Sequence, residues 1–119
     1  MAKIKIQTFF KNDEDSSFIK KEFKGILREN QLCYQEDGMK VSITIFENEI
    51  VLKRRNLEYS LIFTFSKKNS HLMTHLFNEK QNLMIPIELI LLKIENNFIH
   101  IIYKINEKKE LIIEYEVLS

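Results

Sequence analysis

Apolar and polar residues alternate with a period of two in several short segments of the chain. In residues 39–45, Met, Val and two Ile positions are separated by Lys, Ser and Thr, and similar alternation occurs in residues 3–6, 59–65 and 111–117. Because successive side chains of a strand point to opposite faces, each segment is predicted to be a strand with one face in a core and the other in water. Clusters of Asn, Asp, Glu and Lys separate the segments at intervals of about ten residues, which favours an antiparallel sandwich or barrel.

Two segments fit a helix as well as a strand. In residues 16–29 the apolar positions also follow one face of a helix, with serines available as a cap. In residues 70–80, Leu72 and Leu76 form an i, i+4 pair behind Ser70. The local pattern leaves both alternatives open in both places.

Length and composition indicate one ordinary globular domain over residues 1–119. The chain has 45% hydrophobic and 29% charged residues, with two glycines, one proline and no linker-like stretch. A domain of this length can bury a substantial core. The formal net charge of +1 provides no global field that would steer the protein toward nucleic acid or anionic lipid.

The apolar segments are too short or too interrupted to indicate a membrane protein. Residues 1–10 alternate charged and apolar positions, and the longest apolar region, residues 83–92, contains Pro86 and Glu88. A bilayer-spanning helix needs about 20 apolar residues, so we expect no membrane association. The single cysteine, Cys33, excludes an internal disulfide and suits a reducing compartment, and we expect a cytoplasmic protein.

The order of several motifs resembles the uncharacterised bacterial YwiB-like family over nearly the whole chain. The motifs are "KEFKG" followed by "QLCYQE", then "SITIFENEIVLKRR" and "SLIFTF", and finally "IHIIYKI" and "ELIIEYEVL". They place an aromatic residue two before a glycine (Phe23 and Gly25) and end one strand at Arg54 or Arg55. The sequence departs from the family at Asn56, where the family usually has glycine.

This resemblance implies an all-β fold, a single calycin-like, lipocalin-type antiparallel barrel of about 8–10 strands. It also implies that residues 16–29 and 70–80 are strands. A barrel of about eight strands can be filled by its side chains or can hold one small ligand. The biochemical role of the family is not established, so the resemblance implies no activity.

His71 and His75 lie four positions apart, the spacing of two zinc ligands on one helix face. Leu72 stands where a zinc protease has its glutamate, so that reading is excluded. On a strand the two Cα atoms would lie about 13 Å apart, too far to share an ion without a bulge. We therefore predict no metal site, and no cofactor.

No catalytic motif is evident in the remaining residues. His100 shares a face with Phe98 and Ile102 and is accompanied by no serine, cysteine or carboxylate motif. Cys33 has no basic cluster beside it that would lower its pKa. We predict that the protein is not an enzyme.

Arg54 and Arg55 are the most informative polar residues. Adjacent strand residues point to opposite faces, so one of the two is predicted to face the interior. A buried arginine needs a partner, either a protein carboxylate or the acidic head of a ligand. We predict a ligand site at Arg54, Arg55, Tyr59 and Tyr103, with a strand-end arginine in solvent, or one paired with a neighbouring glutamate, as the alternative.

Basic and aromatic residues mix in "FIKKEFK", "KRR" and "FTFSKK", as in proteins that bind single-stranded nucleic acid. The aromatics mostly occupy core-facing positions and acidic clusters interrupt the basic ones, so we expect no nucleic-acid partner. The leading functional hypothesis is a non-enzymatic barrel that binds a small, partly apolar ligand. The alternative is an interaction or structural protein with a packed barrel, one form of which is a homodimer through residues 83–103.

Overall fold

The computed structural model describes residues 2–12, 19–78, 82–95, 98–105 and 110–118. These residues form ten strands: β1 (Ala2–Asn12), β2 (Ile19–Arg28), β3 (Gln31–Glu36), β4 (Met39–Ile45), β5 (Glu49–Arg55), β6 (Tyr59–Ser66), β7 (Ser70–Leu76), β8 (Asn82–Glu95), β9 (Phe98–Ile105) and β10 (Glu110–Leu118). The prediction of an all-β protein with 8–10 strands is confirmed.

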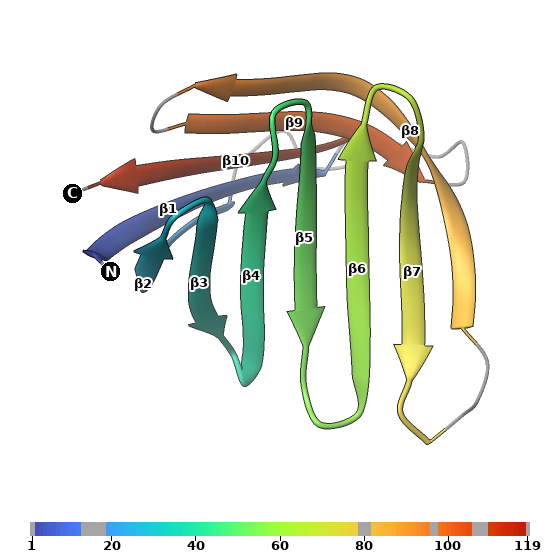
Figure 1. Ribbon diagram of the computed structural model, residues 1–119, viewed down its shortest axis with the longest axis horizontal. Coiled ribbons are helices and arrows are strands. Elements are labelled where there is room, and N and C mark those ends of the chain that lie inside the picture. Colours follow the sequence, from blue (N-terminus) through green and yellow to red (C-terminus); the bar gives the residue numbers. More distant parts are fainter. Residues whose placement is uncertain (1, 13–18, 79–81, 96–97, 106–109, 119) are drawn as a thin grey trace.

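Each strand pairs in antiparallel fashion with the next one along the chain, and β1 pairs with β10 to close the sheet into a barrel (Figure 1). Among the described residues, parts of two strands pair on one side only: residues 19–24 of β2 pair with β1, and residues 82–86 of β8 pair with β7. The connections of β3 to β4 and of β5 to β6 lie at one end, at the bottom of Figure 1, which we call the lower end. The connections of β4 to β5 and β6 to β7 lie at the upper end.

The core lies inside the barrel and is built by the alternation seen in the sequence. Ile43 of β4, Ile50 of β5 and Phe65 of β6 are each 0% exposed, and Ile101 joins them from the opposite wall of the barrel. Inward positions recur at every second residue because strand side chains alternate between the two faces. The middle and upper interior is therefore filled by aliphatic and aromatic side chains.

The two ambiguous segments are strands, and the helix alternative is wrong for both. In β2, Phe23 and Leu27 pack against the core while Ile26 is exposed, so the period is two. In β7, Ser70 and Leu72 are buried while His71 between them is partly exposed, so the period is again two. Pairing with the neighbouring strands overrides the local helical spacing. Residues 16–18 and 79–80 of the two predicted segments lie outside the described ranges.

The long strand β8 pairs with two neighbouring strands along different parts of its length. Its first part pairs with β7 up to Ile87, and its second part pairs with β9 from Ile87 onward (Figure 1). A register shift between Leu89 and Leu91 marks a bulge, which leaves both Ile90 and Leu91 exposed on the outer face. Within the described residues no helix has the length and apolar character needed to cross a bilayer.

Candidate functional site

Arg54 faces the inside of the barrel, and Arg55 faces outward. Arg54 continues the inward row of β5 after the buried Leu52, and its cross-strand partners are Val41 and Leu61. The Arg54 side chain is 30% exposed, whereas Arg55 is exposed to solvent. The expected division of the two arginines between opposite faces is therefore found.

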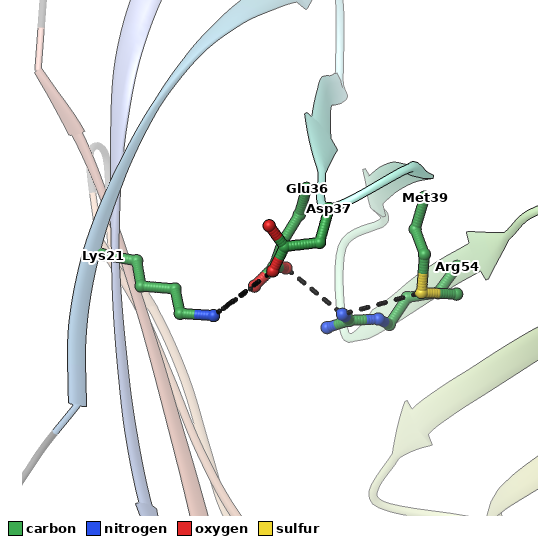
Figure 2. A network of polar contacts seen from close by, with 5 residues as sticks. All are labelled: Lys21, Glu36, Asp37, Met39 and Arg54. Atoms are coloured by element: carbon green, nitrogen blue, oxygen red, sulfur yellow. Dashed lines mark hydrogen bonds and ion pairs between the residues drawn. The ribbon is translucent and has the colours of Figure 1, made fainter.

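The partner of Arg54 is Glu36, the last residue of β3. Arg54 Nη2 donates to Glu36 Oε2 at 3.2 Å, and Lys21 Nζ donates to Glu36 Oε1 at 3.2 Å (Figure 2). Asp37 Oδ2 lies 3.8 Å from the same Lys21 Nζ. Glu36 thus stands between two cations, with its side chain only 12% exposed.

The turn after Glu36 fixes this carboxylate at the lower end. Asp37 and Gly38 have φ angles of 46° and 80°, the positive values that a two-residue turn between twisted strands requires. Aspartate tolerates this region better than most residues, and glycine enters it without steric cost. The turn pairs Glu36 with Met39, whose Sδ lies 4.0 Å from Arg54 Nη2.

Three buried tyrosines lie within range of the Arg54 charge. Tyr34 of β3, Tyr103 of β9 and Tyr115 of β10 are 5%, 3% and 3% exposed. The hydroxyls of Tyr34 and Tyr115 are hydrogen-bonded to each other, and the charge of Arg54 acts on all three phenols. Strands from opposite walls of the barrel therefore converge on one guanidinium.

Burial keeps these phenols protonated. It raises the pKa of Tyr34 and of Tyr103 to about 12, and it raises the pKa of Tyr115 well above its ordinary value. The nearby Arg54 charge opposes the shift in each case without cancelling it. Each group is thus a neutral hydroxyl at physiological pH. Tyr115 donates its proton to Tyr34, so Tyr34 and Tyr103 are the hydroxyls that can donate to another group.

Aromatic contacts hold the tyrosine rings in place. Phe23 stacks on Tyr34 with a centroid separation of 4.8 Å. Tyr103 packs against Phe65 at 5.0 Å and against Phe63 at 6.4 Å. Because the rings are fixed, the hydroxyl groups need little ordering to meet a ligand.

Of the four residues predicted for a ligand site, the structure brings two together. Arg54 and Tyr103 share the interior, where the guanidinium charge reaches the phenol. Arg55 lies on the outer face. Tyr59 begins β6 at the lower rim and is half-buried, with its backbone N–H donating to Asn56 Oδ1 at 2.9 Å. This hydrogen bond shows that the side chain of Asn56 stabilises the turn between β5 and β6.

The sequence reading missed Tyr34, Tyr115, Glu36 and Lys21. The alternation that placed Leu32 and Tyr34 on one face continues to Glu36, so extending it would have put this carboxylate inside the barrel. The convergence of Tyr34 and Tyr115 depends on barrel closure between β1 and β10, which brings β10 near β2 and β3. No local signal carries that information.

The histidines lie on the outer face. His71 and His75 belong to β7, so their spacing is that of a strand, and His75 Nδ1 contacts Asn82 Oδ1. In the part of the chain that the structure describes, no three His, Cys, Asp or Glu residues gather in a metal-binding group. His100, expected to lack a carboxylate, has one across the strand pair: its Nδ1 lies 3.4 Å from Glu114 Oε1.

The outer face of β8, β9 and β10 carries an apolar row. Leu91, Ile102 and Ile112 are cross-strand partners, and Leu91 is 40% exposed. The next row along the strands contains Lys93, His100 and Glu114, which bear charged or titratable groups. Leu91 and Ile102 belong to residues 83–103, the region predicted to form a homodimer, whereas Ile112 lies outside that region.

The fold is similar to that of a solved bacterial protein. The crystal structure of YwiB protein from Bacillus subtilis matches with a TM-score of 0.67 and 11% sequence identity, over 98% of this chain and 89% of that chain. No protein-family model and no curated protein sequence matches the chain. The predicted resemblance to the YwiB-like family is confirmed as a likeness of fold, while the calycin-like classification stays a prediction.

Proposed function

We propose that this protein is a non-enzymatic module that binds a small, partly apolar molecule at the lower end of its barrel, with the polar end of the molecule at Arg54. The observation that carries the proposal is an inward arginine whose charge acts on three buried phenols, in a barrel with a mainly apolar core. Burying a charge is unfavourable unless partners compensate it. A fully packed structural barrel would be more simply built with an aliphatic residue at this position.

The packing of the interior restricts where the ligand binds. Ile43, Ile50 and Phe65 fill the middle and upper part with no exposed surface. Around Arg54, by contrast, Leu61 and Phe63 are only partly buried. The apolar part of the ligand therefore contacts these two side chains, and the ligand enters from the lower end.

The test is saturable binding of a neutral apolar fluorophore, N-phenyl-1-naphthylamine, to the purified protein. We expect one bound molecule per chain and loss of binding in Leu61→Trp, since the larger side chain would occupy the place proposed for the apolar part of the ligand. Ile62→Trp is the matched control, because Ile62 is the next residue of β6 and faces outward. Non-saturable binding, or equal loss in both variants, would contradict the proposal.

The burial of the phenylalanine rings in the basic and aromatic segments argues against a nucleic-acid partner. Base stacking requires exposed aromatic rings beside basic side chains. Phe65 is buried, and Phe23 and Phe63 pack against the core. We propose no nucleic-acid role and, on the composition alone, a cytoplasmic location.

A second candidate function is self-association through the outer face of β8–β10. The apolar row of Leu91, Ile102 and Ile112 beside a row with both charge signs is the specific observation that favours it. A two-fold interface joins one patch to its own copy, so charges of both signs can pair across it. Sedimentation equilibrium tests this proposal: we expect a dimer that Leu91→Lys converts to a monomer, and a monomeric parent protein would exclude it.

A further inference from the structure

The proposed ligand site also indicates the chemistry of the polar end of the ligand. We propose that this end is a carboxylate, which replaces Glu36 at Arg54 while Glu36 stays bound to Lys21. The inference rests on the proposed function and adds the ligand class and an internal competitor. It follows from the hydrogen-bonding capacity, the charge and the position of the groups around Arg54.

The guanidinium of Arg54 has unused donors. Within the described residues its polar contacts are made by Nη2 alone, to Glu36 Oε2 and Met39 Sδ. A guanidinium carries five N–H donors and pairs best with a carboxylate through two parallel hydrogen bonds. The single contact to Glu36 is therefore weaker than the paired arrangement that a free carboxylate could make.

The neighbouring phenols offer hydrogen-bond donors. Tyr103 and the hydrogen-bonded pair of Tyr34 and Tyr115 present protonated hydroxyls near Arg54. The charged acceptor on this side of the network is Glu36 itself. A ligand oxygen with negative charge matches such donors, whereas an ammonium group would meet Arg54 with a charge of the same sign.

Glu36 can leave Arg54 without losing its charge compensation. Its second oxygen already accepts from Lys21, which is 46% exposed and lies toward solvent. The side chain of Asp37, beside it in the turn, is 88% exposed, so the turn is open to water on that side. Exchange of carboxylates at Arg54 therefore leaves no buried charge without a partner.

The charges of the network limit the ligand to one negative charge. Lys21 and Arg54 face Glu36 and Asp37, so the network is neutral before a ligand binds. When Glu36 stays with Lys21, Arg54 pairs with the ligand carboxylate, and the one excess negative charge lies on the side of Asp37, whose side chain is 88% exposed to water. The partly buried Leu61 and Phe63 supply the apolar contact, so a short aliphatic carboxylate fits the site.

The test compares three probes with one tail, octanoate, 1-octanol and octylammonium, by isothermal titration calorimetry of the full chain. We expect octanoate to bind about tenfold more tightly than octanol, the difference expected for a charged hydrogen-bonded pair. Octylammonium should show no measurable binding. In Arg54→Met the advantage of octanoate over octanol should disappear.

Two variants test the role of Glu36 with opposite signs. Glu36→Gln removes the competing charge and should raise octanoate affinity by about tenfold. Lys21→Met removes the second partner of Glu36 and should lower octanoate affinity, because Glu36 then has only Arg54. Arg55→Gln, on the outer face, is the matched control and should leave the affinity unchanged.

The outcomes separate this inference from the proposed function. Equal binding of octanoate and octanol, unaffected by Arg54→Met, would overturn the carboxylate assignment and leave the apolar site standing. Failure of every probe, including the neutral fluorophore, would overturn the proposed function. If Glu36→Gln does not fold, Lys21→Met decides the point, and unchanged or increased octanoate affinity there would refute the competition.

Discussion

The upper and lower parts of the barrel interior treat polar groups differently. In the upper part the buried polar side chain is Ser70, whose Oγ donates to the carbonyl of Ser66 at 2.8 Å and accepts from its N–H at 2.9 Å. In the lower part, Arg54 is compensated by a carboxylate eighteen residues earlier in the chain, at the end of a different strand. The first arrangement supports a turn, and the second holds charge in an apolar interior.

The difference lies in whether a polar group is compensated within its own turn or by side chains from several strands. Satisfying Ser70 locally stabilises a connection without reaching the rest of the barrel. The charges at Arg54 require groups from β2, β3 and β5 to meet, and partly buried side chains surround them. A partly buried ion pair contributes little net stability compared with apolar residues of similar size, and the proposed ligand site gives this pair a role other than stability.

The largest expected effect is loss of core packing in the upper part. Phe65→Ala should destabilise the protein by about 3–5 kcal/mol, since Phe65 is fully buried and its removal leaves a cavity. Phe63→Ala should have a smaller effect, because Phe63 is partly buried. Urea unfolding followed by circular dichroism measures both, and a larger loss at Phe63 would reverse the comparison.

The second largest effect is expected at alkaline pH, where ionisation of the buried tyrosines should lower the stability of the folded protein. The pKa of Tyr34 and of Tyr103 is about 12 in the folded protein, against 10.0 for an unburied tyrosine. The folded state therefore binds more protons than the unfolded state between these values, and stability falls as pH rises from about 10 to about 12. The chain has no tryptophan, so tyrosinate absorbance reports the titration directly. Ionisation of all four tyrosines near pH 10 in a folded protein would contradict burial of the phenols.

Breaking the ion pair from its two sides should give unequal effects. Glu36→Gln should cost about 1 kcal/mol, because it leaves the inward Arg54 charge without its carboxylate in a partly solvated position. Arg54→Met should cost less, since Glu36 keeps Lys21. Thermal unfolding of both variants measures the difference, and a greater loss in Arg54→Met would show that the pair is mainly structural.

The smallest effect is expected on the outer face. Arg55→Gln should change stability by less than about 0.5 kcal/mol, as for other exposed substitutions. The same unfolding assay applies. A loss as large as that of Glu36→Gln would mean that Arg55 has a structural partner.

The sequence predicts the strands better than it predicts the site. Alternation in residues 39–45 and 59–65 indicates which side chains face inward, and adjacency alone separates Arg54 from Arg55. In residues 70–80 the same local pattern fits helix and strand, and only pairing of β7 with β6 and β8 decides between them. Short apolar runs lack the length that would distinguish the two.

The composition of the site depends on closure of the barrel. Tyr115 lies 81 positions after Tyr34, yet their hydroxyls are hydrogen-bonded because β10 pairs with β1 and β1 pairs with β2. The ion pair of Arg54 with Glu36 depends likewise on the register of β3, β4 and β5. Tyr59 looked equivalent to Tyr103 in the sequence, but it begins its strand at the rim.

The most direct test of the ligand site is the response of the two arginine side chains to octanoate in solution. In nitrogen-15 spectra of the labelled protein, the Nε–H resonances of Arg54 and Arg55 are assigned with the Arg54→Met and Arg55→Gln variants. The account predicts a saturable shift of the Arg54 resonance and a stationary Arg55 resonance. Equal shifts of both, or no shift of Arg54 at octanoate concentrations that saturate binding, would contradict it.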